Sequence, residues 1–396
     1  MAPPADGTAV PLVDDCCRRA VELLRRNATP AGILAATPGE RAARRDYTTV
    51  FGRDAAICAL GMAVSGAAEL REAAWAGLRT LASRQAANGQ LPNYVRPASG
   101  EADFWYSGCI DATLWWLIAF HSCVERGIGS AAELATQAER ALAWLACQEH
   151  PDWGLVQQNE ASDWADIMPR SGYVLYSNAL WYGVKRLYDL PGAAVTRDYA
   201  NLLFFPFAGP VPERRRARLL MHYVRNRVQR RDLYLSFVNF ALWGEEGDVF
   251  GNILACLSGL ADTSRSLAIV RTLRRAGVDH PHPVRAVVEP IAEESPLWRL
   301  YMARHRQNHP WQYHNGGSWP FIGGFWVLLL AQLGLVQPAR QELVRLAEAN
   351  RCNGWEFNEW LHGRSGEPRG MPGQSWNAAT FLLARHALEN RLRLFG

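Results

Sequence analysis

Several kinds of sequence signal are missing from this 396-residue chain, and the first is any sign of a metal site. Its eight cysteines include no CxxC motif and no Cys/His cluster with the spacing of metal ligands. Four of them (Cys58, Cys109, Cys123 and Cys256) lie among apolar neighbours, as reduced, buried thiols do. We therefore expect a cytoplasmic protein that uses no metal or other cofactor.

Signals for membranes are also lacking. The first 15 residues have neither a basic segment nor an apolar one, so they do not resemble a signal peptide. The longest apolar run, 321–336, contains a polar residue and is too short to span a bilayer. A buried helix is the better interpretation, and no membrane partner is expected.

Charge of one sign is not in large excess either, because the net charge is only +4. The basic residues are almost all arginine, and they form two runs within 214–218 and 225–231. Leu219, Leu220, Tyr223 and Val228 are interleaved with these runs at helical spacing. That pattern is typical of the solvated face of a helix rather than of a nucleic-acid patch.

Strand-like alternation and linker-like segments are scarce, whereas helical periodicity runs through the chain. The sequence predicts one all-α domain over 1–396, with residues 1–12 flexible and a possible insertion near 206–232. Some predicted helices are amphipathic, such as 131–145, and others are apolar on every side, such as 112–120 and 321–333. A helix that is apolar all round must be covered all round. Two concentric rings of helices, an α/α toroid, satisfy this need; a large bundle or an α-solenoid is the alternative.

The loops before the apolar helices share a composition: an acid or amide, an aromatic residue and a small residue. Such groups suit a sugar, whose hydroxyls need polar partners and whose ring faces need flat aromatic walls. For Asp111 and Asn178, helix capping is an equally good explanation. The candidate substrate-binding residues in these loops are Arg53, Asp54, Asn93, Asp111, Trp115, Trp164, Arg170, Asn178, Trp181, His314, Asn315, Trp319, Gln374 and Trp376.

Cleavage of a glycosidic bond needs two carboxyl groups, one of them protonated through an apolar setting. In the segment SDWADIMPRSG, Asp166 lies between Trp164 and Ile167–Pro169, which favours the neutral acid, whereas Asp163 follows Ser162 and resembles a turn residue. A cation near Asp166 would lower its pKa. We therefore expect Arg170 to point at the substrate or at another acid.

The ordered set of motifs from Tyr47 to Leu383 resembles that of the (α/α)6-barrel glycoside hydrolases. FGRDAAI and DATLWW are similar to segments of the amylo-α-1,6-glucosidase part of glycogen debranching enzyme. YHNGGSWP is similar to the neutral/alkaline invertases (family 100), and MPRSGYVLYSNALWY is similar to debranching and family 63 enzymes. The segment 206–296 matches poorly apart from GDVFGN.

This resemblance implies an inverting mechanism on an α-linked glucosyl group, with Asp166 as the general acid. It implies that Arg53 and Asp54 hold the terminal sugar and that His314, Asn315 and Trp319 line its site. Each of these also has a plain structural alternative: an ion pair for Arg53–Asp54, a core histidine for His314, and a loop end for Trp319.

The resemblance implies that the general base lies in GWEFNEWLHGRSG, but two alignments with these families differ by three residues. The glycines that follow favour Glu359, whereas the distance to Trp376 favours Glu356. We prefer Glu359 because the local glycines constrain the turn more closely.

The function expected from these observations is an inverting, exo-acting glycoside hydrolase that acts on a small glucoside or oligosaccharide, with sucrose or an α-1,6-linked glucoside as the leading substrates. A non-catalytic carbohydrate-binding toroid is the alternative. A prenyl-cyclase-like enzyme is disfavoured because the chain has no DxxDD motif.

Overall fold

The computed structural model describes residues 6–207, 217–229, 232–239 and 242–396. Six helices form an inner ring in which each contacts the next: α3 (Gly52–Ala63), α5 (Ile110–Glu125), α7 (Leu175–Leu187), α10 (Val249–Leu257), α12 (Pro320–Gln332) and α14 (Ser375–Asn390). The contact between α14 and α3 closes this ring.

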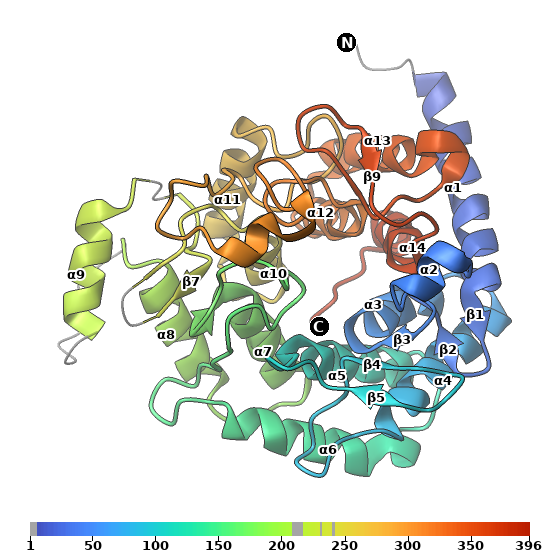
Figure 1. Cartoon of the computed structure of the whole chain (residues 1–396), viewed down its shortest axis with the longest axis horizontal. Helices are drawn as coiled ribbons and strands as arrows, with labels where there is room; N and C mark the ends of the chain where they lie inside the picture. The colour runs from blue at the N-terminus through green and yellow to red at the C-terminus, as the bar shows by residue number, and fades with distance from the viewer. Residues whose placement is uncertain (1–5, 208–216, 230–231, 240–241) are drawn as a thin grey trace.

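A second set of helices packs on the outside of the inner ring, as Figure 1 shows end-on. It comprises α1 (Asp6–Asn27), α4 (Ala68–Ala82), α6 (Ala131–Cys147), α8 (Ala193–Phe204), α11 (Thr263–Arg275) and α13 (Val336–Trp355). The predicted all-α toroid is thus confirmed as two concentric rings, the (α/α)6 architecture.

Burial explains which helix belongs to which ring. In α12 every residue from Pro320 to Leu330 is buried, because α10, α13 and α14 cover it. In the outer helix α6, only Leu134, Ala138, Ala141 and Leu145 are buried, which is one stripe at helical spacing. The two classes of helix expected from the sequence correspond to these two rings.

Glycines allow the inner helices to approach closely. A Cβ added to Gly61 on α3 would overlap the Ala379 carbonyl oxygen on α14. One added to Gly324 on α12 would lie 2.5 Å from Thr380 Cβ. Both positions therefore require glycine for steric reasons, and both lie where a neighbouring inner helix packs against α14.

The remaining elements are short. They are the helix α2 (Glu40–Arg44), the 3-10 helix η1 (Leu300–Arg306), and α9 (Ala217–Arg227), which lies outside the rings at the left of Figure 1. The strands are β1 (Ala28–Thr29), β2 (Gly32–Ile33), β3 (Val50–Phe51), β4 (Tyr94–Val95), β5 (Ala102–Asp103), β6 (Tyr173–Val174), β7 (Phe237–Val238), β8 (Trp360–Leu361) and β9 (Pro368–Arg369).

Two sequence-based expectations concern the less regular parts. Helix α1 begins at Asp6, and residues 1–5 lie outside the described part, so the expected flexibility of residues 1–12 stays a prediction. The possible insertion at 206–232 is described only in part, and that part contains α9. Whether the whole chain is one domain remains a proposal.

Backbone pairing shows that all six inner helices begin at the same end of the barrel. The antiparallel sheet β3–β4–β5 joins the loops before α3 and α5, and β6 pairs with β7 before α7 and α10. Bridges Asp248–Val287, Ser318–Leu361 and Ala36–Gln374 continue the circuit through α12 and α14 back to α3. These loops carry the candidate site.

Candidate active site

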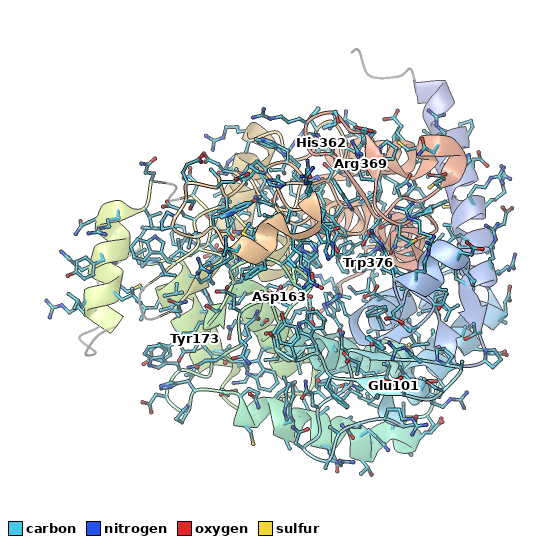
Figure 2. All side chains as sticks on the ribbon, viewed as in Figure 1. Glu101, Asp163, Tyr173, His362, Arg369 and Trp376 are labelled. Carbon is cyan, nitrogen blue, oxygen red and sulfur yellow. The ribbon has the colours of Figure 1, made fainter. Side chains whose placement is uncertain are left out.

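Most of the candidate residues lie in the loops or first turns at the end of the barrel where the inner helices begin. Among the residues labelled in Figure 2, Asp163 before α7 and Trp376 in the first turn of α14 lie nearer the middle of the ring than Tyr173 or Glu101. Segments more than 200 residues apart in sequence therefore face one centre.

Glu359 is a deeply buried carboxylate with two fixed hydrogen bonds. The residue is 3% exposed. Oε1 accepts a hydrogen bond of 2.5 Å from the Tyr47 hydroxyl, and Oε2 accepts one of 2.9 Å from the Met371 backbone N–H. Burial raises the pKa of Glu359, while the hydrogen bonds from Tyr47 and Met371 lower it. The two donors hold the carboxylate in one orientation.

Asp166 is a different kind of carboxyl. It follows a turn in which Asp163 accepts hydrogen bonds from the Ala165 backbone N–H at 2.8 Å and from Gln158 at 2.9 Å, so the expected turn role of Asp163 is confirmed. The Asp166 side chain remains 43% exposed, although protein surrounds the carboxyl. This surrounding protein raises its pKa to about 7, and Arg53 opposes the rise. No side chain in the described ranges donates a hydrogen bond to it.

Four aromatic rings and His314 form one packed group beside these acids. His314 stacks on Trp319 with ring centroids 5.1 Å apart, and Trp164 meets both edge-on, at 4.9 and 5.4 Å. Phe321 stacks on Trp376 at 4.0 Å. Burial lowers the pKa of His314 well below its usual value, so the ring is neutral, with Nδ1 3.8 Å from Asp166 Oδ1. The structure thus brings Trp164, His314, Trp319 and Trp376 together with Asp166.

Arg53 and Asp54, in the first turn of α3, form part of a charged cluster. Arg53 lies 3.5 Å from Asp54 Oδ2 and 3.1 Å from Asp111 Oδ2, and Asp111 also accepts a hydrogen bond from the Tyr176 hydroxyl at 3.1 Å. Burial raises the pKa of Asp54 to about 6 in spite of Arg53. The ion pair weighed as a plain alternative for Arg53 is present, and it leaves carboxylate oxygens free to bind another group.

Arg170 pairs with acids that the sequence did not single out. It is 1% exposed and lies 3.2 Å from Asp248 Oδ1 and 3.6 Å from Glu246 Oε1. The expectation that Arg170 points at another acid is confirmed, and the cation that lowers the pKa of Asp166 is Arg53. Arg170 thus neutralises buried acids before α10.

Several candidate residues serve the framework instead. Trp115 is fully buried, stacks on Phe250 and donates to the Tyr176 hydroxyl at 2.7 Å. Trp181 donates to Glu149 at 2.8 Å. Their rings are covered by protein and form no wall for a ligand, so their assignment as substrate-binding residues is corrected.

The amide candidates also bind backbone. Asn178 bonds to Val156 and Val174, and Asn315 bonds to Ile291 and Asn308. Asn93 accepts the Gly52 N–H at its backbone carbonyl. The side chains of Asn178 and Asn315 and the backbone of Asn93 thus help to fix these loops.

The capping explanation for Asp111 and Asn178 is wrong. Asp111 lies inside the first turn of α5, whose N-cap residue is Cys109, and its carboxylate binds Arg53 and Tyr176. Asn178 is the fourth residue of α7. Both side chains make tertiary contacts that sequence alone does not distinguish from caps.

Glu356, the competing base, lies in a different environment. Its Oε2 accepts hydrogen bonds of 3.0 Å from Asn353 and from Asn358, and the residue is only part-buried. Within the part of the chain that is described, it makes no hydrogen bond or ion pair with Tyr47 or with the loop before α7. The geometry therefore favours Glu359 over Glu356.

Buried polar atoms without a protein partner gather at this end. Within the described ranges they include Asp54 Oδ2, Asp111 Oδ1, Trp164 Nε1, His314 Nδ1, both amide atoms of Gln374, and Trp376 Nε1. Buried polar groups are nearly always hydrogen-bonded in native proteins. Such a set of donors and acceptors matches what the hydroxyl groups of a sugar require.

Two tyrosines were missed by sequence reasoning. Tyr47 holds Glu359 from a loop 312 residues away in sequence. Burial raises the pKa of Tyr313 well above its usual value, and the charges of Glu359 and Asp166 both add to this, so Tyr313 lies near both acids. The signal available was an aromatic residue in the loops before α3 and α12, but nothing in the sequence paired either with a carboxylate.

Two absences concern the described ranges alone. No group of three or more His, Cys, Asp or Glu side chains there has the arrangement of a metal site. None of the described helices is long and apolar enough to cross a membrane.

Known proteins resemble this chain in sequence over about a third of its length and in structure over nearly all of it. Residues 248–391 match the family described as alkaline and neutral invertase. A probable alkaline/neutral invertase F of Arabidopsis thaliana is 32% identical over 146 residues, which are 35% of this chain and 28% of that protein. Cytosolic invertase 1 of Oryza sativa subsp. japonica is 32% identical over 144 residues, 35% of this chain and 25% of that one. The chain thus spans only about a quarter of the length of the invertases it matches.

The whole fold is similar to solved glycosidases. The crystal structure of a family 63 mannosylglycerate hydrolase from Thermus thermophilus superposes with a TM-score of 0.61 at 17% identity, covering 93% of this chain and 99% of that one. A wild-type protein described as a glycosidase gives a TM-score of 0.62 at 14% identity, covering 98% and 99%. The chain therefore has the same (α/α)6 fold as these two proteins. The invertase match includes the loops of His314 and Glu359 but not that of Asp166.

Proposed function

We propose that the protein is an inverting, exo-acting glycoside hydrolase that releases a terminal α-linked glucosyl unit. The proposal rests chiefly on the contrast between two carboxyl groups: Asp166, accessible and with a pKa of about 7, and Glu359, buried and held by two hydrogen-bond donors. An inverting glycosidase needs this division between a protonated acid and an ionised base.

Asp166 acts as the general acid in this proposal. Its carboxyl donates a proton to the glycosidic oxygen as the bond from that oxygen to the anomeric carbon breaks. A pKa near 7 keeps much of the group protonated at neutral pH and still allows it to release the proton. The His314 ring, whose Nδ1 lies 3.8 Å from Asp166 Oδ1, is neutral and so places no positive charge beside the acid.

Glu359 acts as the general base. Its carboxylate takes a proton from a water molecule, and the water oxygen then attacks the anomeric carbon from the side opposite the leaving oxygen. The hydrogen bonds from Tyr47 and Met371 favour the ionised form and fix the orientation of the accepting oxygen. Tyr47 is a positioning residue in this scheme.

The terminal sugar is held by the partnerless polar groups around the two acids. Asp111 Oδ1 and Asp54 Oδ2, the latter 3.5 Å from Arg53, accept no hydrogen bond from the protein and can accept one from a hydroxyl, and Gln374 offers an amide with both ends free. Trp164 and Trp376 supply indole N–H donors beside aromatic faces. Arg53 balances the charge of the two aspartates.

The proposed substrate class rests on sequence relatives and on a fold neighbour rather than on the geometry of the site. The invertase relatives support sucrose, and the DATLW and NALWY segments support an α-1,6-linked glucoside. The fold neighbour is a mannosylglycerate hydrolase, which adds glycerate glycosides to the candidates. The free cysteines and the cytosolic invertase relative support a cytoplasmic setting.

The test is a substrate panel followed for release of free sugar. Sucrose, isomaltose, maltose, glucosylglycerate, mannosylglycerate and limit dextrin are incubated with the wild type and with the Asp166→Asn variant. We expect release from at least one member with the wild type and almost none with the variant. If the wild type releases no sugar from any member but binds one of them, the non-catalytic alternative is supported instead.

Inversion is tested separately with the substrate that the panel identifies. Proton NMR of the first product should show β-glucose before mutarotation, because one displacement inverts an α-linkage. First appearance of α-glucose would contradict the single-displacement mechanism. In a crystal structure, carboxyl groups about 6.5–9.5 Å apart would support inversion, and about 5 Å would oppose it.

A further inference from the structure

Two large hydrophobic side chains stand out for their exposure. Tyr106 is 87% exposed and Leu300 is 92% exposed, whereas the other exposed large hydrophobics of the described ranges lie between 42% and 56%. Tyr106 lies in the loop before α5, and Leu300 begins η1 in the loop before α12. Both loops belong to the end of the barrel that holds the carboxyl pair.

These two residues flank the segment that carries Asp166. On one side, Trp105 Nε1 donates to the Ala161 carbonyl at 3.0 Å, and its ring lies 4.9 Å from that of Tyr106. On the other side, Glu160 Oε1 accepts hydrogen bonds from the Tyr301 hydroxyl at 2.7 Å and from Arg299 at 3.2 Å. We call Trp105, Tyr106, Leu300 and Tyr301 the rim.

The rim is fixed in place although its apolar faces are open to solvent. Besides the Trp105 and Tyr301 bonds, Asn159 donates to the Ser107 carbonyl at 3.1 Å, and Asn308 donates to the Ile167 carbonyl at 2.7 Å. The Asp166 segment is therefore tied to both flanking loops. An ordered, exposed aromatic surface of this kind is typical of a binding site.

Solvent exposure of the side chains increases from Glu359, the proposed base, towards the rim. Glu359 is 3% exposed, the Asp54 side chain is 10% exposed, that of Asp166 is 43%, and Tyr106 is 87%. If Asp166 protonates the leaving oxygen, the leaving group lies on the open side of the scissile bond. The rim is the apolar surface that lies next to this side.

We propose that the rim binds the leaving-group portion of the substrate, and that this portion includes at least one neutral sugar ring. This proposal rests on the proposed hydrolase function. Tyr106 and Leu300 would contact the apolar face of the ring, while Glu160 and Arg299 would bind hydroxyls at its edge. Arg299 and Glu160 pair with each other, so this pair adds no net charge to the rim.

Binding to a slowed enzyme tests the rim apart from turnover. In the Asp166→Asn background, affinities for glucose, isomaltotriose and 1-kestose are measured by calorimetry, with and without the added pair Tyr106→Ala and Leu300→Ala. We expect the rim pair to weaken trisaccharide binding roughly 3- to 10-fold, as expected for loss of an aromatic contact. Glucose, which fills only the innermost site, should bind within about twofold of the parent, because it does not reach the rim.

The controls use other exposed residues. The pair Leu219→Ala and Tyr223→Ala on α9, with starting exposures of 56% and 46%, should leave both affinities unchanged. Tyr106→Phe keeps the ring and should retain trisaccharide binding.

Three outcomes would overturn the proposal. If the double substitution at Tyr106 and Leu300 weakened glucose and trisaccharide binding equally, the rim would not bind the leaving group, but the proposed hydrolase function would stand. A change from oligomer to monomer in gel filtration would show that the rim is a contact between copies of the chain. If neither parent nor wild type bound any of the three sugars, the proposed function itself would fail, and the rim proposal with it.

Discussion

The hydrogen bond from Tyr47 to Glu359 gives the sharpest prediction, because one atom can be removed without changing the packing. Tyr47→Phe deletes the hydroxyl that donates to Glu359 Oε1 at 2.5 Å and keeps the ring that packs beside Phe51 at 6.3 Å. Glu359 would retain only the Met371 N–H on its other oxygen. A 3% exposed glutamate would then have one carboxylate oxygen without a protein donor.

The size of the expected fall in kcat/KM follows from the loss of a hydrogen bond to a charged group. Hydrogen bonds to charged groups contribute about 1.5–3 kcal/mol. If the ionised base loses that support in the transition state, kcat/KM should fall roughly 10- to 150-fold at neutral pH. Because the Tyr47 hydrogen bond lowers the pKa of Glu359, its removal should move the acidic limb of the pH profile to higher pH.

The assay compares pH profiles of kcat/KM for the wild type, Tyr47→Phe and a matched variant. Tyr188→Phe is the control, because it also removes a hydroxyl that donates to protein, here to the Leu117 carbonyl at 2.8 Å, away from the site. The control should keep wild-type activity. If Tyr47→Phe lowered activity without moving the acidic limb, a role for Tyr47 in orienting the ionised base would be refuted.

Further predictions concern the acids. Glu359→Gln should reduce turnover by several orders of magnitude and Glu356→Gln by less than about tenfold; the reverse order in steady-state kinetics would transfer the base role to Glu356. Asp166, with a pKa of about 7, must be protonated to act, so kcat/KM should fall as pH rises through about 7. A substrate with a leaving group that needs no protonation should lack this alkaline limb, and persistence of the limb would assign it to another group. Burial raises the pKa of Glu342 from 4.5 to about 8, so the folded state holds a proton that the unfolded chain releases above pH 4.5. Stability should therefore decrease as pH rises from about 4.5 to about 8, and Glu342→Gln should flatten the Tm measured across that window; an unchanged slope would contradict the buried proton.

The arrangement of helices was predictable because it depends on local pattern. Helix α12 is apolar on all sides and must be covered on all sides, whereas α6 has a single apolar stripe and needs cover on one side only. The number of sides to be covered determines whether a helix lies in the inner or the outer ring. Helix α1 shows the limit of local pattern, because it begins at Asp6 and continues through Pro11. Pro11 lacks the N–H that would bond to the Gly7 carbonyl one turn earlier, so the sequence there does not by itself favour a helix.

The candidate site was predictable in composition but not in pairing. Asp166, His314, Trp164 and Trp319 come together as the loop composition suggested. Trp115 did not, because an aromatic residue one turn into an inner helix is covered by the neighbouring helices. Partners from distant loops, such as Tyr47 for Glu359, depend on the closed ring, which a local pattern does not encode.

The common direction of the six inner helices has an electrostatic consequence. Each helix N-terminus carries roughly half a positive charge from its aligned peptide dipoles. With all six beginning at one end, the backbone itself makes that end electropositive and stabilises negative side chains there. This helps to explain how Asp54, Asp111, Asp248 and Glu359 can all be buried around so few cations. The positive helix ends alone would disfavour a positively charged sugar transition state. In the proposed reaction, the excess of carboxylates at the same end would offset this effect and stabilise that transition state.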